Sequence, residues 1–271
     1  MQLIAITGGK GGVGKTNIAV NLSISMARDG HNVLLLDADL GLANIDVVLG
    51  INAAYTMADV IEGRKTLAEI VITGPEGVRI IPGASGVAKL TELSSAAQNM
   101  LVRSFSEELT SPDVLVVDTG AGVDSAVQTF VSACKTVVVV VNDEPASLTD
   151  AYALMKIMRN ERGVRRFELL VNQVDTPAQG RSVYDRITRV TDQYLDVDVG
   201  YLGTVPSDPY LKRAVQERSA LMTAYPRAPA AIAIRHVAHR LMSIQSLAVN
   251  SGRMSFFVEA LLKSDNLMAG S

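Results

Sequence analysis

Short runs of apolar, largely β-branched residues recur along the chain, and polar or glycine-rich stretches separate them. The runs lie at 3–6, 33–36, 79–82, 114–117, 136–141, 167–171 and 199–205. Since most of them do not alternate with polar positions, they predict strands that are buried on both faces of a sheet. The unbroken run at 136–141 predicts a central strand.

Segments with helical character lie between these strands. The first helix is expected to end near Asp29, with Gly30 as its left-handed cap. Helix and turn are expected at 52–70, and helix is expected at 90–109 and through 154–158. Alternation of strand and helix predicts an α/β fold, a doubly wound, mainly parallel sheet flanked by helices. No linker or repeat divides the pattern, so residues 1–250 are expected to form one domain.

A second unit, a C-terminal tail, is predicted at 251–271, after a hinge at Ser251-Gly252. Its apolar residues form one stripe of an amphipathic helix, namely Met254, Phe257, Val258, Leu261 and Leu262. Two interpretations stay open: the helix docks on the body, or it lies in a membrane interface over 253–263. One short helix binds a membrane weakly, so stable attachment would need two copies.

Composition limits the class of protein. The chain has 271 residues, 48% of them hydrophobic and 20% charged, which is enough for a substantial core. Its formal net charge of −3 argues against sequence-blind binding to nucleic acid, so the locally basic helix expected at 159–166 is interpreted as a solvated face and not as a DNA-binding surface. Cys134, the single cysteine, is expected to be a core thiol. No signal peptide or membrane span is evident, so we expect a cytoplasmic protein.

The strongest chemical signal is the stretch 9–16, which reads GKGGVGKT. A strand precedes it and a helix follows it, which is the order that a phosphate-binding loop requires. Glycines let backbone N–H groups converge on phosphate oxygens, and the helix N-terminus favours negative charge. Lys15 is expected to reach the β- and γ-phosphates, and the Thr16 hydroxyl to ligate Mg²⁺.

A rival interpretation is a dinucleotide site, because Gly9, Gly11 and Gly14 also spell G-x-G-x-x-G, and an acid, Asp37, ends the second strand. That fold has no use for the Lys15-Thr16 pair at this place. Two further acids, at 39 and 118, also favour a triphosphate with its metal ion. We therefore predict a nucleoside triphosphate site.

Three acids are placed for metal and water chemistry. Asp37 and Asp118 follow strands and would face the phosphates, because parallel sheets bind ligands at the carboxyl ends of their strands. With Thr16 they form the predicted Mg²⁺ site, although an acid at 37 or 39 could instead cap the next helix. The small residues at 120–122 would let the loop after Asp118 change conformation with the phosphate state.

Lys10, at the second position of the loop, gives the stretch the form of the deviant P-loop of the MinD/ParA family, which the chain resembles from end to end. The resemblance implies a P-loop NTPase fold that binds ATP or ADP with Mg²⁺. It implies that Lys10 reaches the phosphates of a second copy and that Asp39 positions the attacking water, so the catalytic residues would be Lys10, Lys15 and Asp39. The nucleotide would be bound by Gly9, Lys10, Gly11, Gly12, Val13, Gly14, Lys15, Thr16 and Asn17.

The same family resemblance implies contacts to adenine from two later places. One is Asn172, after a late strand, and the other is the loop of Pro206, Ser207 and Asp208. A turn asparagine and an ordinary proline loop stay open as alternatives.

Within the family, several stretches resemble the bacterial flagellar-number regulators, among them DADLGLANIDVVLG at 37–50 and DEPASLTDAYALMK at 143–156. This resemblance implies a slow, ATP-dependent homodimer that restrains an AAA+ flagellar transcription activator and could oppose the flagellar-placement GTPase. A division-site or DNA-partition ATPase is the alternative. A metal-cluster ATPase is disfavoured, because a cluster normally draws more than one cysteine from each chain.

Overall fold

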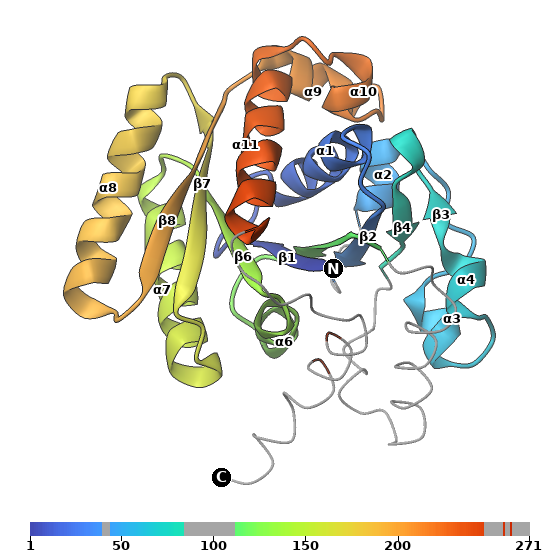
Figure 1. Cartoon of the computed structure of the whole chain (residues 1–271), viewed down its shortest axis with the longest axis horizontal. Coiled ribbons are helices and arrows are strands. Elements are labelled where there is room, and N and C mark those ends of the chain that lie inside the picture. Colours follow the sequence, from blue (N-terminus) through green and yellow to red (C-terminus); the bar gives the residue numbers. More distant parts are fainter. Residues whose placement is uncertain (40–43, 84–111, 247–256, 258–260, 262–271) are drawn as a thin grey trace, which may run out of the picture.

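The computed structural model of the chain describes residues 1–39, 44–83, 112–246, 257 and 261. In these residues an eight-stranded sheet has the order β3-β4-β2-β5-β1-β6-β7-β8 (Figure 1). The strands are β1 (Gln2–Thr7), β2 (Val33–Ala38), β3 (Ile72–Thr73), β4 (Arg79–Ile81), β5 (Val114–Thr119), β6 (Thr136–Val141), β7 (Arg166–Val174) and β8 (Asp198–Pro206). Every neighbouring pair is parallel except β3 with β4. The predicted doubly wound, mainly parallel sheet is confirmed.

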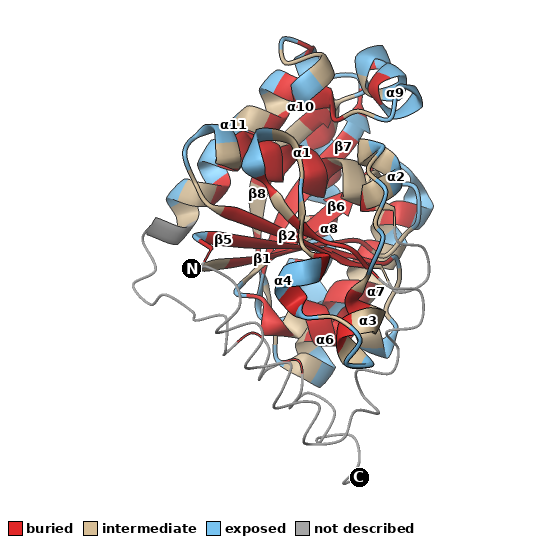
Figure 2. Ribbon diagram, turned by 90° about the vertical axis from the view of Figure 1, so that its right-hand side faces the viewer, coloured by how far each residue is buried: buried red, intermediate tan, exposed pale blue. Residues whose placement is uncertain are grey.

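Helices cover both faces of the sheet (Figures 1 and 2). One face carries α1 (Lys15–Arg28), α2 (Ile45–Leu49), α9 (Pro209–Gln216), α10 (Leu221–Ala224) and α11 (Pro229–Ser246). The other carries α3 (Met57–Ile61), α4 (Leu67–Ile70), α6 (Ser125–Ala133), α7 (Pro145–Arg162) and α8 (Pro177–Tyr194). A short 3₁₀ turn lies at Pro75–Gly77. No helix among the described residues combines the length and apolar character that crossing a bilayer needs.

Alternate residues of each inner strand enter two separate cores, as the two-residue period of a strand requires. In β6, Val137, Val139 and Val141 belong to the core under α6 and α7, whereas Val138 and Val140 belong to the core under α1 and α11. All five are buried, and β6 lies between β1 and β7, so the predicted central strand is confirmed. The predicted left-handed cap of the first helix is also confirmed, since Gly30 has φ 92°.

Two residues of the C-terminal stripe are described. Phe257 and Leu261 are both helical and buried, and both belong to the core on the α6 and α7 side of the sheet. For these two side chains, burial favours the docked interpretation over direct contact with a membrane. The remainder of the predicted tail, its hinge and the helix expected at 90–109 lie outside the described residues.

The helix expected over 159–166 is wrong in its second half. Helix α7 ends at Arg162, Gly163 follows with φ 70°, and β7 begins at Arg166. A left-handed glycine stops a helix at little cost, which is the physical reason for the break.

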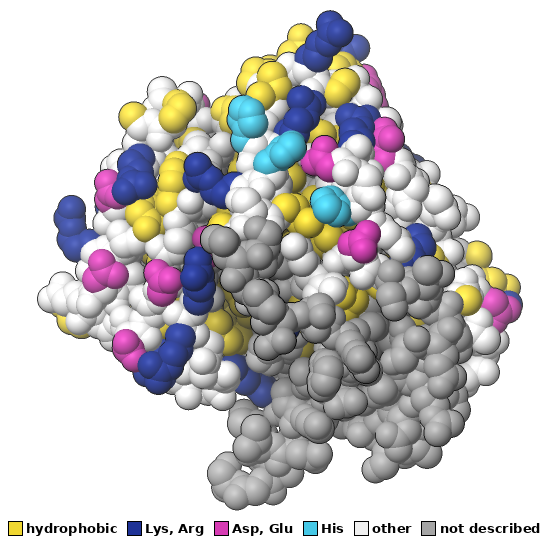
Figure 3. All heavy atoms as spheres, viewed as in Figure 1, with side chains coloured by type: hydrophobic (Ala, Val, Ile, Leu, Met, Phe, Trp, Pro, Cys, Tyr) yellow, Lys and Arg dark blue, Asp and Glu magenta, His cyan; other side chains and the backbone are white. Residues whose placement is uncertain are grey.

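Two arginines of this basic segment form ion pairs within the chain. Arg159 and Arg165 both bind the Asp196 carboxylate, 3.2 and 2.8 Å away. Basic and acidic side chains are interspersed over the face shown in Figure 3.

Strand β8 lies at one edge of the described sheet. The Arg240 guanidinium, from α11, donates to the carbonyl oxygens of Tyr201 and Leu202, each 3.2 Å away. The pairing of β8 with β7 also shifts register after Leu169, and Gly203 has φ 154° there. A side chain and an irregularity therefore occupy the part of an edge strand that could otherwise pair with another strand.

Candidate functional site

The carboxyl ends of the parallel strands meet at one edge of the sheet, and the loop between β1 and α1 lies there. Gly12 and Gly14 of this loop have φ 80° and 93°, a backbone conformation that favours glycine. Gly14 is the N-cap of α1, so the loop delivers the chain directly into the first turn of that helix. The free N–H groups of that turn and the exposed loop backbone form a ready site for an anion.

The base of the loop is closely packed and its rim is open. A Cβ on Gly9 would lie 2.3 Å from the carbonyl carbon and oxygen of Asp150 on α7, and a Cβ on Gly8 would lie 2.8 Å from the Val140 oxygen. By contrast, no atom lies within 4 Å of a Cβ placed on Gly11 or Gly12. The first two glycines therefore fix the loop against β6 and α7, and the later ones leave room for a ligand.

Lys15 is buried and points back into the loop. Its Nζ atom donates a hydrogen bond to the carbonyl oxygen of Lys10, 3.5 Å away. Burial lowers the pKa of Lys15, and the nearby carboxylates of Asp118 and Asp39 oppose this shift. The Lys15 ammonium therefore lies at the loop, among carbonyl oxygens and acids, where it can bind phosphate oxygens.

Asp37 and Asp118 lie directly beside one another, because β2 and β5 pair in a register that matches these two residues. Asp118 is 1% exposed, and its Oδ1 atom has no hydrogen-bond partner. Burial raises the pKa of Asp118 to about 8, against a hydrogen bond with Thr16 that lowers it. A buried carboxyl oxygen without a partner in the fold is unusual, and it fits a role in binding a ligand.

Mg²⁺ fits this arrangement. No group of three or more His, Cys, Asp or Glu in the described part of the chain could hold a metal ion alone. Mg²⁺, however, normally binds one or two carboxylates together with substrate phosphates and water. The Thr16 hydroxyl beside the unpartnered Asp118 oxygen offers the protein share of such a site.

Asp37 also performs the capping role that the sequence left open. Its two carboxylate oxygens accept hydrogen bonds from the backbone N–H groups of Asp39, Asn44 and Ile45, at 3.0 to 3.2 Å. These bonds oppose the effect of burial, which raises the pKa of Asp37 to about 6. The carboxylate therefore anchors the chain after β2 and the start of α2 beside the phosphate loop.

Asp39, the acid that was predicted to be catalytic, lies over the loop that follows β5. A Cβ on Gly120 would be 3.3 Å from its Oδ1 atom, and its charge acts on Lys15. The loop after β5 is itself tied to the phosphate loop, since the Gly122 N–H donates to the Gly8 oxygen at 3.3 Å. The loop predicted to change conformation with the phosphate state therefore lies against both Asp39 and the phosphate loop.

Asn172 reaches the phosphate loop from inside the end of β7. Its Nδ2 atom donates to the Val13 oxygen at 2.8 Å, whereas its buried Oδ1 atom has no partner.

In the Pro206 loop, the Asp208 carboxylate has a structural role that the sequence did not indicate. It caps both α9 and α11, accepting hydrogen bonds from the N–H groups of Tyr210 and Ala230 at 2.9 Å each. The Asp208 carboxylate is thus engaged within the fold, whereas Ser207 is exposed.

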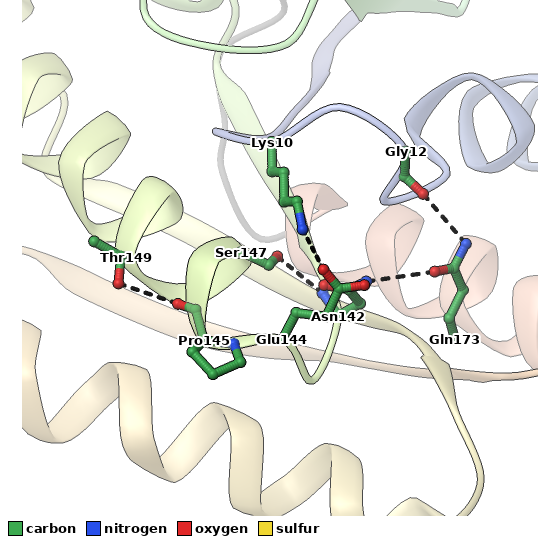
Figure 4. A network of polar contacts seen from close by, with 8 residues as sticks. All are labelled: Lys10, Gly12, Asn142, Glu144, Pro145, Ser147, Thr149 and Gln173. Carbon is green, nitrogen blue, oxygen red and sulfur yellow. Dashed lines mark hydrogen bonds and ion pairs between the residues drawn. The ribbon is translucent and has the colours of Figure 1, made fainter.

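Three polar residues at the site were missed by sequence reasoning (Figure 4). Glu144 forms an ion pair with Lys10, Asn142 donates to the Glu144 carboxylate at 2.9 Å, and Gln173 donates to the Gly12 oxygen at 3.4 Å. Asn142 and Glu144 follow β6, and Gln173 lies near the end of β7, so their position after strands was the available signal.

A family model, the CobQ/CobB/MinD/ParA nucleotide binding domain, matches residues 4–221, which include the phosphate loop and the acids at 37 and 118. The chain belongs to this family. The family resemblance expected from Lys10 and its loop is confirmed, and so is a nucleotide-binding domain in place of a dinucleotide fold.

Relatives within the family include flagellar proteins. Antiactivator FleN of Pseudomonas aeruginosa is 47% identical over 263 residues, which cover 97% of this chain and 94% of that protein. Flagellum site-determining protein YlxH of Helicobacter pylori is 37% identical over 268 residues, covering 97% of this chain and 90% of that protein. The expected similarity to flagellar regulators over nearly the whole chain is confirmed.

Solved structures of cell-division relatives share the fold. A chain of the MinC:MinD cell division protein complex of Aquifex aeolicus has a TM-score of 0.72 at 26% identity and covers 93% of this chain and 99% of its own. MinD of Pyrococcus horikoshii, complexed with Mg-ADP, has a TM-score of 0.72 at 23% identity, with coverage of 92% and 99%.

The buried acids of this MinD/ParA-type site predict how the stability of the nucleotide-free chain depends on pH. The folded-state pKa of Asp118, about 8, lies above its unfolded value, so the folded chain binds more protons between these values. The free energy of unfolding therefore falls as pH rises through this window, by roughly 2 kcal/mol between pH 6 and pH 8.

Urea unfolding at each pH measures this free energy. Asp118→Asn should flatten the dependence, and the exposed control Asp192→Asn should keep it; an equal slope in all three would contradict this account.

Proposed function

We propose that this chain is a slow, ATP-dependent dimerising ATPase that limits the number of polar flagella, by restraining an AAA+ flagellar transcription activator. The observation that carries the proposal is the 47% identity to Antiactivator FleN over 97% of the chain, with the phosphate loop and its acids inside the matched region. Binding of ATP would set the population of paired chains, and pairing would set partner binding.

The proposed nucleotide is ATP, and Asn172 supports the choice of base. Since Nδ2 is committed to the Val13 oxygen, the unpartnered Oδ1 atom is oriented as an acceptor. Adenine carries a donating amino group at the position where guanine carries an acceptor oxygen. An acceptor buried at this place would bind adenine and repel guanine. The loop of Pro206, Ser207 and Asp208 would complete the base site.

The proposed chemistry depends mainly on orientation and charge. Lys15 and the N-terminus of α1 would hold the phosphates, and Thr16 with Asp37 and Asp118 would hold Mg²⁺, which supplies charge neutralisation at the transferring phosphoryl group. Lys10 of each chain would act on the phosphates of the other chain. Because part of the charge stabilisation comes from a second copy, turnover by a single chain would be slow.

Asp39 is proposed to orient the attacking water. Asp39→Ala should retain ATP binding and ATP-dependent pairing but lose at least about 100-fold in turnover, since positioning a nucleophile is worth several kcal/mol. Phosphate release from the purified variant measures turnover, and sedimentation with a non-hydrolysable analogue measures pairing. Asp46→Ala, in the neighbouring helix α2, is the matched control. Wild-type turnover in Asp39→Ala would remove Asp39 from the mechanism.

Further partners are proposed from the resemblance alone. These are the flagellar-placement GTPase and a reversible contact of residues 253–263 with the inner face of the cell membrane. The membrane contact requires that Phe257 leave the core in which it is buried. A division-site ATPase is the second candidate function, favoured by the 28% identity to MinD of Bacillus subtilis over 89% of the chain.

The function is tested in a bacterium with one polar flagellum whose own flagellar-number regulator has been deleted. Expression of this chain should restore a single flagellum, and the Lys15→Ala chain should leave the cells with many. The same two chains are expressed in a strain that lacks its septum-site ATPase. Correction of septum placement without correction of flagellar number would replace the proposed function by the second candidate.

A further inference from the structure

In the single chain, Lys10 is bound by a carboxylate of its own chain. Its ammonium forms an ion pair with Glu144, the N-cap residue of α7 (Figure 4). The ion pair lowers the pKa of the Glu144 carboxyl. The Lys10 and Glu144 side chains are 34% and 53% exposed, so the pair lies at the surface, where a second chain could reach it.

The Glu144 carboxylate is held in place from the other side. Its second oxygen accepts from Asn142 Nδ2 at 2.9 Å, and the Asn142 N–H donates to Ser147 Oγ at 3.2 Å. Both Asn142 and Ser147 are buried. The carboxylate therefore meets Lys10 from a prearranged position.

The far arm of the phosphate loop is tied to the same group of residues. Gln173 donates from Nε2 to the Gly12 oxygen at 3.4 Å, and its Oε1 atom accepts from Asn142 at 3.5 Å. Gln173 has φ 59°, a strained conformation for a residue with a side chain. Non-glycine residues with such a backbone cluster at switch and binding sites.

The neighbouring acid does not compete for Lys10. Asp143 is bound by Arg186 and by Gln179, both on α8, which together lower the pKa of its carboxyl. Asp150, whose backbone packs on Gly9, lies about 1.7 helical turns further along α7 than Glu144. Among the described residues, Glu144 is the carboxylate that forms an ion pair with Lys10.

We propose that Glu144 is a positioning residue that holds Lys10 within its own chain, and that pairing of two nucleotide-loaded chains exchanges this carboxylate for the phosphates bound by the partner. The inference rests on the proposed function, which gives Lys10 its role across the dimer. Pairing then competes with an ion pair in each chain, so a chain without nucleotide keeps its lysine neutralised.

The size of the effect follows from the exposure of the pair and from symmetry. One exposed ion pair changes an equilibrium by less than about tenfold. A two-fold symmetric dimer breaks two of them, one in each chain. Since one such pair typically contributes about 1.4- to fivefold and two factors multiply, Glu144→Gln, which keeps the shape but removes the charge, should strengthen pairing about two- to thirtyfold.

The first measurement is the dissociation constant of the dimer, from sedimentation velocity with Mg²⁺ and a non-hydrolysable ATP analogue. Wild type is compared with Glu144→Gln and with Glu161→Gln, which makes the same charge change at the exposed far end of α7. Tighter pairing in Glu144→Gln alone supports the exchange. Equal or weaker pairing in that variant overturns it.

The second measurement tests the hold within the single chain and needs no dimer. A water-soluble acetylating reagent is applied to the nucleotide-free protein, and mass spectrometry follows the modification rate of each lysine. Glu144→Gln should raise the rate at Lys10 several-fold and leave exposed Lys156, the internal control, unchanged. An unchanged rate at Lys10 overturns the proposal. If wild type fails to pair at all, the proposed function fails instead, and the acetylation rate still reports on the ion pair.

Discussion

Replacement of Lys15 by alanine is expected to abolish nucleotide binding, with a loss in affinity of about 100-fold or more. Lys15 is buried at the start of α1, between the loop carbonyls and the acids at 39 and 118. Without its charge, the triphosphate would enter a site whose nearest titratable side chains are carboxylates. Loss of one partner from a buried charged contact costs about 3 to 5 kcal/mol, and 1.4 kcal/mol corresponds to a tenfold change.

Calorimetry with Mg-ATP measures the affinity directly, and ligand-induced stabilisation gives a second readout. At ATP concentrations of 100 times its dissociation constant, wild type should gain about 2.7 kcal/mol of stability, and a variant that binds 100-fold more weakly about 0.4 kcal/mol. Lys156→Ala removes an exposed lysine of α7 and serves as the matched control. Wild-type affinity in Lys15→Ala would mean that the glycine loop is not the triphosphate site.

The second large effect is expected at Gly9. A Cβ there would lie 2.3 Å from the Asp150 carbonyl, a backbone group that cannot rotate away. Gly9→Ala must therefore displace the loop from α7, and overpacking of this kind costs about 1 to 3 kcal/mol. Since the loop backbone also forms the phosphate site, we expect loss of both stability and nucleotide affinity.

Gly11→Ala is the matched control, because it makes the same substitution two residues along the loop, where no atom lies within 4 Å of the added carbon. Urea unfolding without nucleotide compares the two variants, and Gly11→Ala should differ little from wild type. Equal stability of Gly9→Ala and Gly11→Ala would show that the loop does not rest on α7.

Much of the site could be predicted because its residues are defined by position along strands. Asp37 and Asp118 end apolar runs, parallel strands end at one edge, and the register of β2 with β5 then places the two acids side by side. The loop could be predicted because its chemistry is contiguous in sequence. Lys15 and Thr16 follow the glycines directly.

What could not be predicted depends on contacts between distant residues. Nothing local indicates that Glu144 lies beside Lys10, since 134 residues separate them. The loop of Pro206, Ser207 and Asp208 was predicted to contact adenine, and nothing local indicates that the Asp208 carboxylate caps two helices, one of which starts about twenty residues later. Strand β3, with two residues, is too short to produce a pattern, and its antiparallel pairing with β4 is set by the tertiary fold.

Arg240 has a consequence for how copies of the chain can assemble. An open strand edge invites strand-to-strand addition, which has no natural end point and produces fibres. With its guanidinium on the carbonyls of Tyr201 and Leu202, the rim of the sheet offers fewer free acceptors to a neighbour. Strand β8 is thereby less open to the addition of a strand from another copy, and the proposed pairing of two chains would use a different surface.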